Sequence, residues 1–413
     1  MRALLPFTKY HGLGNDFVLI DARELVFDPS LAPLLADWSN VVSRLAPQIC
    51  DRHHGVGADG VILAMPIYGA AEIEPFDPQA RAKTGKKTTG EFPSRCTSPS
   101  VSGEGAAFLA KQYRQAVAAL TADYPQVDSC ELSWVYTNSD GSNAVMCGNG
   151  LRCLALWARL RGGVDTRAFK IATAKGAIEV LFDSDQRITV DVGEPILEAA
   201  KVPVSGQQLS DVQKLIHVDL SVGSKKVNAL AVGMGNPHCV IFDEKFWSGW
   251  SNALESSESS ASTSASTSAS KSVALPKLKH PELLDGADLH ELTALAQSIQ
   301  NNPAFPASAN VEFVQIVSRD LVRCYVYERG CGFTLACASG AAAVVVAGVL
   351  TNQLDRTATV QLPGGALEIS FVQSNNRVEI TGPAAEIFSG VFKLEHLPSL
   401  ELGSESKAEA NCK

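Results

Sequence analysis

The sequence lacks the features that mark several common classes of protein. Its 413 residues carry a formal net charge of -9 and no basic cluster dense enough for a nucleic-acid surface, so no nucleic-acid partner is expected. No apolar run can span a bilayer, and the first ten residues hold no long apolar stretch of the secretory kind, so we expect neither a membrane protein nor an exported one. The ten cysteines show no paired metal-ligand spacing, which favours free thiols in a reducing compartment, the cytoplasm, over a disulfide framework or a metal site.

Two short stretches of the sequence share one residue pattern. Cys147 and Cys337 each precede a few small or turn-forming residues and then a run that reads as a helix. Leu151–Leu160 is apolar apart from two arginines, and Ala341–Leu350 is apolar throughout. A helix that is apolar all round is a buried one, and ten residues are too few to cross a membrane. The pattern therefore predicts that each cysteine begins a central helix of its own domain.

This placement has chemical consequences for the two cysteines. A helix N-terminus offers unpaired N–H groups and a partial positive charge, so it can hold a carboxylate and favour a thiolate. The dipole contributes only about 0.3–1 kcal/mol, which lowers a cysteine pKa by less than about one unit. Two such helix ends facing one ligand can set one sulfur on each face of an α-carbon. That arrangement suits removal of a proton from one face and its return to the other.

Several polar residues lie near the ends of predicted strands. Glu328 and Arg329 end an apolar strand eight residues before Cys337, where the guanidinium can clamp a carboxylate and Glu328 can accept an ammonium group. A surface ion pair is the alternative for these two residues. Four asparagines, each of which can also be an ordinary turn residue, occupy turns or strand edges: Asn15, Asn138, Asn236 and Asn310. The cysteines interpreted as core residues are Cys153, Cys239, Cys324 and Cys331.

The rest of the chain predicts strands in both halves, around two insertions. Residues 7–21 read as two strands with a Gly-Leu-Gly-Asn turn, and residues from Phe169 read as antiparallel hairpins. Helices are expected near 106–122 and 289–300, and further strands at 310–316, 322–327, 359–361, 366–371 and 378–381. Both halves share the order of strands, cysteine and buried helix, which is a weak internal repeat.

Six motifs in one order resemble the diaminopimelate epimerase family. The resemblance extends from about Phe7 to Leu394, apart from the insertions. The matching segments are Gly12–Phe17, Asp51–Asp59, Asn138–Ser142, Met146–Gly150, Gly235–Cys239, and Tyr327–Gly330 with Ala336–Cys337.

The resemblance implies an α+β fold of two similar domains, each a mostly antiparallel β-sheet wrapped around a central helix, with the active site in the cleft between them. The first domain would be residues 1–168 with a returning strand at about 386–396 and an insertion at about 66–132. The second would be residues 169–385 with a Ser-rich insertion at about 251–280, followed by a flexible tail at 397–413.

The resemblance also implies an isomerase that needs no pyridoxal phosphate, other cofactor or metal. It would convert the small molecule LL-2,6-diaminopimelate to meso-2,6-diaminopimelate in lysine and peptidoglycan precursor biosynthesis. A homodimer is one oligomeric state that the sequence leaves open. Cys147 and Cys337 would be the two bases, one thiolate and one thiol, in an order that depends on the stereochemistry of the substrate.

The resemblance assigns roles to the surrounding residues as well. Backbone N–H groups of Gly148, Asn149, Ala338 and Ser339 would hold the reacting carboxylate. Asn15 would bind near the reacting centre. The distal end would be held by Asn138, Asn236, Asn310 and Arg329, with Glu328 on its ammonium group.

Three positions depart from the family pattern, and three other functions stay open. Ala338 stands where the family usually has Gly, Phe333 where it often has Glu or Pro, and Gly60 where some members have a substrate-contacting Gln. The alternatives are a proline or hydroxyproline racemase, a cysteine hydrolase that uses His238, and an inactive binding protein. The sequence does not determine the role of the insertions or the oligomeric state. It also does not determine whether the protein works in a bacterial cytoplasm or in a plastid.

Overall fold

The computed structural model describes residues 4–67, 104–144, 146–164, 166–184, 187–205, 208–209, 216–222, 225–242 and 286–394. The Ser-rich insertion around 251–280, the tail at 397–413 and residues 68–103 of the insertion at about 66–132 lie outside these residues. The expectations for these three segments therefore stay predictions.

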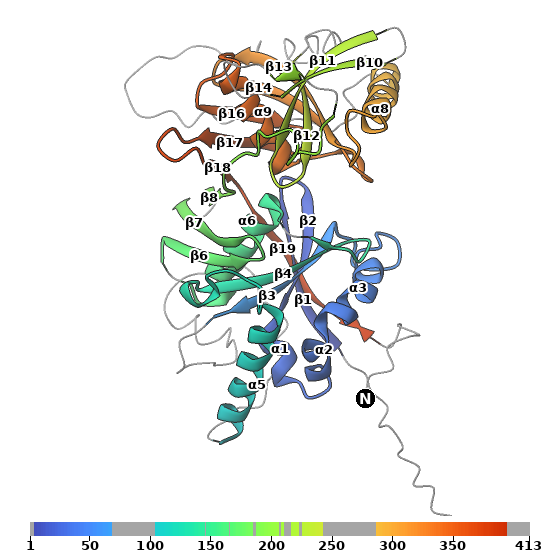
Figure 1. Cartoon of the computed structure of the whole chain (residues 1–413). Coiled ribbons are helices and arrows are strands. Elements are labelled where there is room, and N and C mark those ends of the chain that lie inside the picture. The colour runs from blue at the N-terminus through green and yellow to red at the C-terminus, as the bar shows by residue number, and fades with distance from the viewer. Residues whose placement is uncertain are drawn as a thin grey trace, which may run out of the picture.

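The first half is built on a sheet that the two ends of the chain complete together. β1 (Leu4–Gly12) pairs on one side with β2 (Asn15–Asp21) and on the other with β19 (Ala385–Lys393), which returns from the far end of the sequence. Figure 1 shows β19 in red beside the blue β1. The sheet continues through β3 (Gly60–Pro66), β4 (Leu132–Asn138) and the short β5 (Asn143–Ala144).

Four helices pack on this sheet and form a hydrophobic core with it. They are α1 (Ala22–Phe27), α2 (Ala32–Ala36), α3 (Trp38–Ile49) and α5 (Glu104–Leu120), and a 3-10 turn, η1 (Val127–Ser129), precedes β4. The helix expected at 106–122 is thus confirmed, whereas the three helices before it are not among those expected from the sequence. The signal is present in α3, whose buried residues Trp38, Val41, Val42, Leu45, Ala46 and Ile49 follow the helical repeat.

The cysteine helix of the first half is wrapped by three antiparallel strands. α6 (Gly148–Trp157) is buried along its whole length and ends in a π-helical turn, η2 (Ala158–Gly162). The three strands are β6 (Ala168–Thr173), β7 (Gly176–Ser184) and β8 (Arg187–Asp191), as the sequence predicted for this region. β6 pairs with β4, and β6, β7 and β8 lie beside α6 in Figure 1. The domain boundary expected at residue 168 assigns these three strands to the second half.

The second half repeats this plan around α9 (Ala338–Leu350). Its apolar surface is buried on all sides from Ala341 to Ala347, as expected for a central helix. α8 (Gly286–Gln300), close to the helix expected at 289–300, packs on the outside of the sheet in Figure 1. The strands are β9 (Gln208–Leu209), β10 (Ile216–Val222), β11 (Lys225–Gly233), β12 (Pro237–Phe242), β13 (Asn310–Ser318), β14 (Leu321–Glu328), β15 (Gly332–Thr334), β16 (Thr357–Leu362), β17 (Gly365–Phe371) and β18 (Val378–Gly382).

The expected α+β class is confirmed, but the sheets are mixed and not strictly antiparallel. Parallel pairs are β2–β3, β4–β6, β12–β13 and β14–β16. Parallel neighbours need a crossover connection, and each of these four connections contains at least one helix. The two cysteine helices occupy equivalent crossovers, β4–α6–β6 and β14–α9–β16, so the internal repeat is structural.

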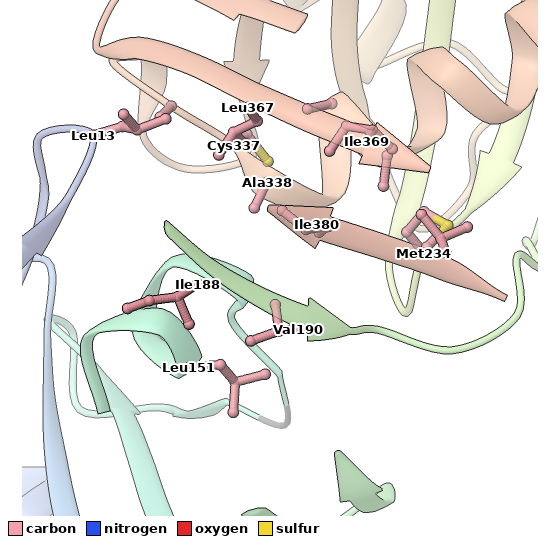
Figure 2. Packing of buried hydrophobic residues seen from close by; sticks show 14 of the residues in the cluster. Leu13, Leu151, Ile188, Val190, Met234, Cys337, Ala338, Leu367, Ile369 and Ile380 are labelled. Atoms are coloured by element: carbon pink, nitrogen blue, oxygen red, sulfur yellow. The ribbon is translucent and has the colours of Figure 1, made fainter. Parts of the chain in front are cut away.

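The two halves join through backbone pairing and a shared core. β8 pairs antiparallel with β18, from Ile188↔Gly382 to Asp191↔Glu379. One hydrophobic cluster runs across the junction, and Figure 2 shows Ile188 and Val190 of β8 between Leu151 of α6 and the residues Ile380 and Ala338 of the other half. None of the helices in the described ranges is both long and apolar enough to cross a membrane.

Candidate active site

Cys147 caps the N-terminus of α6. Its backbone is extended and its Sγ accepts a hydrogen bond from the N–H of Gly150 at 3.4 Å. The side chain is partly buried, and burial raises the pKa of the Cys147 thiol to about 11, while the Gly150 N–H opposes this rise. The unliganded thiol is therefore protonated at neutral pH, and ionisation requires a further favourable interaction.

Cys337 is the N-cap residue of α9 and its backbone is also extended, but its side chain makes no capping hydrogen bond. Its Sγ lies 3.4 Å from Oγ of Ser339 and 3.8 Å from Nδ2 of Asn310. Burial, followed by the nearby Glu328 carboxylate, raises the pKa of the Cys337 thiol well above its usual value. Both cysteines thus begin buried helices, as the sequence predicted, and both favour the neutral thiol before a ligand binds.

The two helix starts are in contact across the junction of the halves. A Cβ added at Gly148, the first residue of α6, would lie 3.0 Å from Cβ of Ala338, the first residue of α9. The side chain of Asn149 donates from Nδ2 to the carbonyl of Ala336 at 3.0 Å. The four residues whose backbone N–H groups were expected to hold one carboxylate, Gly148, Asn149, Ala338 and Ser339, are therefore brought together.

Glu328 lies close to both thiols at the end of β14. Its Oε1 accepts from Oγ1 of Thr334 at 2.5 Å, and its charge raises the pKa of Cys147 as well as that of Cys337. Burial raises the pKa of Glu328 itself. Glu328 is thus placed near both thiols, and its contact with a substrate ammonium group stays a prediction.

Arg329 follows Glu328 and is exposed. Its Nη1 donates to the carbonyl of Ala307 at 2.9 Å, and its backbone N–H donates to Oδ1 of Asn310 at 3.1 Å. The guanidinium has five N–H groups, so donors remain for a carboxylate. No surface ion pair between Glu328 and Arg329, the alternative for these residues, occurs among the described contacts.

Three of the four asparagines lie at the ends of strands, and Asn310 is the one among them with a described contact to a thiol. Asn15 begins β2 and its Oδ1 is buried without a hydrogen-bond partner among the described residues. Asn138 ends β4 and donates to Oγ of Ser142 at 2.9 Å. Asn310 begins β13 and bridges Arg329 and Cys337, as given above. Their contacts with substrate stay predictions.

Asn236 lies in the turn before β12 and is oriented by a buried pair that the sequence did not reveal. Nε2 of His238 lies 3.0 Å from Oδ1 of Asn236, and Nδ1 of His238 lies 2.6 Å from Oε1 of Glu312. His238 and Glu312 are fully buried, and burial raises the pKa of Glu312. His238 is thus engaged by Asn236 and Glu312, whereas a cysteine hydrolase would need it beside a sulfur. A glutamate inside the apolar strand 310–316 was the available signal.

The three departures from the family pattern have clear structural settings. A Cβ at Gly60 would lie 2.6 Å from Cε2 of Tyr136 and 2.7 Å from the carbonyl oxygen of Thr137, so no side chain fits there. Phe333 packs edge-on against Tyr327, with ring centroids 5.0 Å apart. The Cβ of Ala338 faces Gly148, as described above. Among the described residues, no cluster of three His, Cys, Asp or Glu side chains could hold a metal.

Known proteins resemble this chain along nearly its whole length. The family model described as diaminopimelate epimerase matches residues 103–198 and 282–387. The diaminopimelate epimerase of Heliobacterium modesticaldum is 33% identical over 397 residues, covering 94% of this chain and 100% of the relative. That of Nostoc punctiforme is 34% identical over 388 residues, covering 94% and 99% respectively.

Solved structures extend the likeness in fold alone. A probable proline racemase from Agrobacterium radiobacter, solved with carbonate, has a TM-score of 0.52 at 9% identity, covering 97% of this chain and 96% of that one. A hydroxyproline epimerase from Agrobacterium vitis, solved with trans-4-hydroxy-L-proline, has a TM-score of 0.50 at 10% identity, covering 95% and 94%. With identities above 30% across nearly the whole length of its curated relatives, and with two paired cysteine helices, the chain belongs to the diaminopimelate epimerase family of isomerases.

Proposed function

We propose that this protein interconverts LL- and meso-2,6-diaminopimelate by a two-base mechanism that uses Cys147 and Cys337 and no cofactor. The observation that carries the proposal is the contact between the two helix starts, where a Cβ at Gly148 would lie 3.0 Å from Cβ of Ala338. Each of these helices is capped by a cysteine, so one carboxylate bound between them would have a sulfur from each half beside its α-carbon. Its product would serve lysine and peptidoglycan precursor synthesis.

The first step is proton removal. A carboxylate bound by the N–H groups of Gly148, Asn149, Ala338 and Ser339 gains from both helix dipoles, and the same groups stabilise the negative charge that develops when the α-proton leaves. One cysteine, as thiolate, takes this proton and becomes a thiol. Contact between the two halves keeps water out, which helps a weak base act on a weak carbon acid.

The second step is proton return from the opposite face. The other cysteine, as thiol, gives its proton to the α-carbon and becomes the thiolate, so protons and charge balance over one turnover. The cysteine that acts first depends on the configuration of the substrate. The active state has one thiolate and one thiol. Because burial raises the pKa of both cysteines, forming this state costs free energy for the buried thiolate charge, and the helix N-termini offset part of that cost.

The distal half of the substrate accounts for the remaining polar residues. Arg329, Asn138, Asn236 and Asn310 would bind its carboxylate and amino groups, with Asn15 near the reacting centre and Glu328 on an ammonium group. A proline racemase would need none of these distal contacts, and a single catalytic cysteine would not need two abutting helices. The working enzyme needs two reduced thiols, so we place it in the cytoplasm.

Solvent exchange at the α-carbon tests this function. In D2O, the enzyme should incorporate deuterium at the α-carbon of LL-diaminopimelate while forming the meso isomer, followed by mass spectrometry and chiral chromatography. Cys147→Ser and Cys337→Ser should each reduce epimerisation by orders of magnitude. Cys331→Ser is the matched control, because Cys331 is exposed and its interpretation as a core residue was wrong. Turnover of proline alone, or a covalent acyl intermediate on one cysteine, would overturn the proposal.

The returning strand supports a proposal that the protein acts as a homodimer. Among the described residues β19 pairs only with β1, so its outer edge presents free backbone groups. The strand also exposes Ile387 and Val391, at 48% and 50%, and the neighbouring Leu4. A second copy can cover an apolar edge of this kind by symmetric pairing, because the same patch faces itself across a two-fold axis.

A further inference from the structure

Arg152 is a buried cation at the start of its own helix. It lies in the apolar helix α6 and is 0% exposed. Side chains on a helix lean toward its N-terminus, so the guanidinium returns to the first turn, where Nη1 donates to the carbonyl of Gly148 at 3.2 Å and Nη2 to Oδ1 of Asn149 at 2.7 Å. A helix N-terminus is already partially positive, so this is an unfavourable place for a cation unless an anion joins it.

No carboxylate provides that anion within the described part of the chain. The third contact of Arg152 runs from Nε to the carbonyl of Pro383 at 3.3 Å, so all three acceptors are neutral. Burial lowers the pKa of Arg152 to about 10, which leaves the group charged at neutral pH. The charge of Arg152 lowers the pKa of Cys147, whereas the charges of Glu328 and Glu312 raise that of Cys337.

The same guanidinium fixes the contact between the two cysteine helices. Arg152 offers only donors, so the Asn149 amide must turn its oxygen toward it and its nitrogen away. That nitrogen donates to the carbonyl of Ala336, the residue before Cys337, at 3.0 Å. Asn149 is 2% exposed, so water does not compete for either bond. A continuous chain of two hydrogen bonds thus runs from α6 to the start of α9.

Glycine at two neighbouring positions makes room for this arrangement. A Cβ at Gly12 of β1 would lie 3.2 Å from Nη2 of Arg152, and a Cβ at Gly382 of β18 would lie 3.4 Å from Nε. Strands from both halves therefore close over the guanidinium. The site is built around this side chain, which the sequence showed only as one of two arginines in an apolar run.

We propose that Arg152 is a positioning residue for the two thiols: its hydrogen bonds hold the helix start of Cys147 in register with that of Cys337, and its unpaired charge favours the thiolate of Cys147 and a bound carboxylate. This inference deepens the proposed two-thiol reaction and rests on it. We expect its charge to act more strongly on Cys147, which begins the same helix, than on Cys337.

Thiol titration and turnover in two variants separate the two parts of this role. Arg152→Met keeps much of the side-chain volume and removes both charge and hydrogen bonds, whereas Arg152→Lys keeps the charge and loses the planar fork. Rates of iodoacetamide modification are measured against pH for Cys147 in a Cys337→Ser background, with the modified peptide identified by mass spectrometry. We expect Arg152→Met to slow modification of Cys147 roughly tenfold below its pKa, and Arg152→Lys to restore most of that rate.

Turnover should respond differently from titration. Both variants should lower kcat on diaminopimelate, because neither can hold the Asn149 amide through a planar fork, while KM changes less. The internal control is Cys337 in a Cys147→Ser background, whose pH profile should stay unchanged. Arg323→Met, at a partly buried arginine of β14 that donates to Gln315 and Gln361, controls for the loss of an arginine as such.

Two results would overturn the inference. One is a Cys147 profile in Arg152→Met identical to that of the parent. The other is an equal change at Cys147 and Cys337, which would mark a general loss of structure. If Arg152→Met does not fold, a kcat of Arg152→Lys equal to that of the parent would also overturn the inference. Thiol modification needs no substrate, so failure of the parent enzyme to exchange the α-proton refutes the proposed reaction separately.

Discussion

Replacement of Gly148 by alanine perturbs the place where the two halves meet. The added Cβ would lie 3.0 Å from Cβ of Ala338 and 3.4 Å from Cδ1 of Ile380. Apolar carbons rest at about 3.5–4.0 Å, so the two helix starts must separate by roughly 0.5–1 Å. Gly148 has an ordinary helical backbone, and no positive φ opposes the substitution.

The expected effect is large on turnover and small on stability. Alanine in a helix is favoured over glycine by up to about 1 kcal/mol, and overpacking costs about 1–3 kcal/mol, so unfolding should become easier by about 0–2 kcal/mol. A displacement of about 1 Å between reacting groups can reduce a rate roughly 100-fold. We therefore expect kcat for epimerisation to fall about 10- to 100-fold while the melting temperature falls by only a few degrees.

A second substitution tests the cause. Ala338→Gly removes the atom that the new side chain meets, so the double variant Gly148→Ala with Ala338→Gly should recover most of the lost kcat, while Ala338→Gly alone stays near the parent. Epimerisation is followed by chiral chromatography, and thermal unfolding by circular dichroism gives the stability of all four proteins. An activity within twofold of the parent in Gly148→Ala, or a double variant no better than the single, would refute the reasoning.

Four further outcomes are expected. Because burial raises the pKa of Cys147 to about 11 and that of Cys337 well above its usual value, kcat/KM should increase with pH from 6 to 9.5, and a flat profile in steady-state assays would contradict this. Oxidation of the Cys147 and Cys337 thiols to a disulfide by diamide should abolish activity, dithiothreitol should restore it, and indifference to the oxidant would count against their proximity. Val391→Glu should shift a dimer toward monomer in size-exclusion chromatography with light scattering, because a charge on the exposed β19 edge opposes pairing. Leu154→Ala, in the core of α6, should reduce the free energy of unfolding by about 2–5 kcal/mol in a urea titration.

The sequence is most informative where apolar spacing and turn residues coincide. The run 341–350 is apolar throughout and follows a small-residue turn, so the residues alone predict α9 and its cysteine cap. Alternation around 310–316 and 322–327 predicts β13 and β14 for the same reason. The helical repeat in α3 is equally regular but lies in a stretch with no chemical motif to draw attention to it.

Features that depend on tertiary contact could not be read from spacing. Parallel neighbours such as β4 and β6 are specified by the helix that crosses between them, not by their own residues. Glu312 looks like an exposed position of an alternating strand until His238 is placed beside it. Arg152 likewise looks like an ordinary helix arginine, and only the closure of Gly12 and Gly382 over it shows that it is central.

The pairing of β1 with β19 constrains the order in which this protein acquires its structure. Oγ1 of Thr8 contacts Oγ of Ser389 at 3.0 Å, although the two residues are 381 positions apart. During synthesis β1 leaves the ribosome long before β19, its outer neighbour. The first half therefore keeps an open strand edge until β19 has been made, so the amino-terminal half finishes folding after the strands of the carboxy-terminal half have been made.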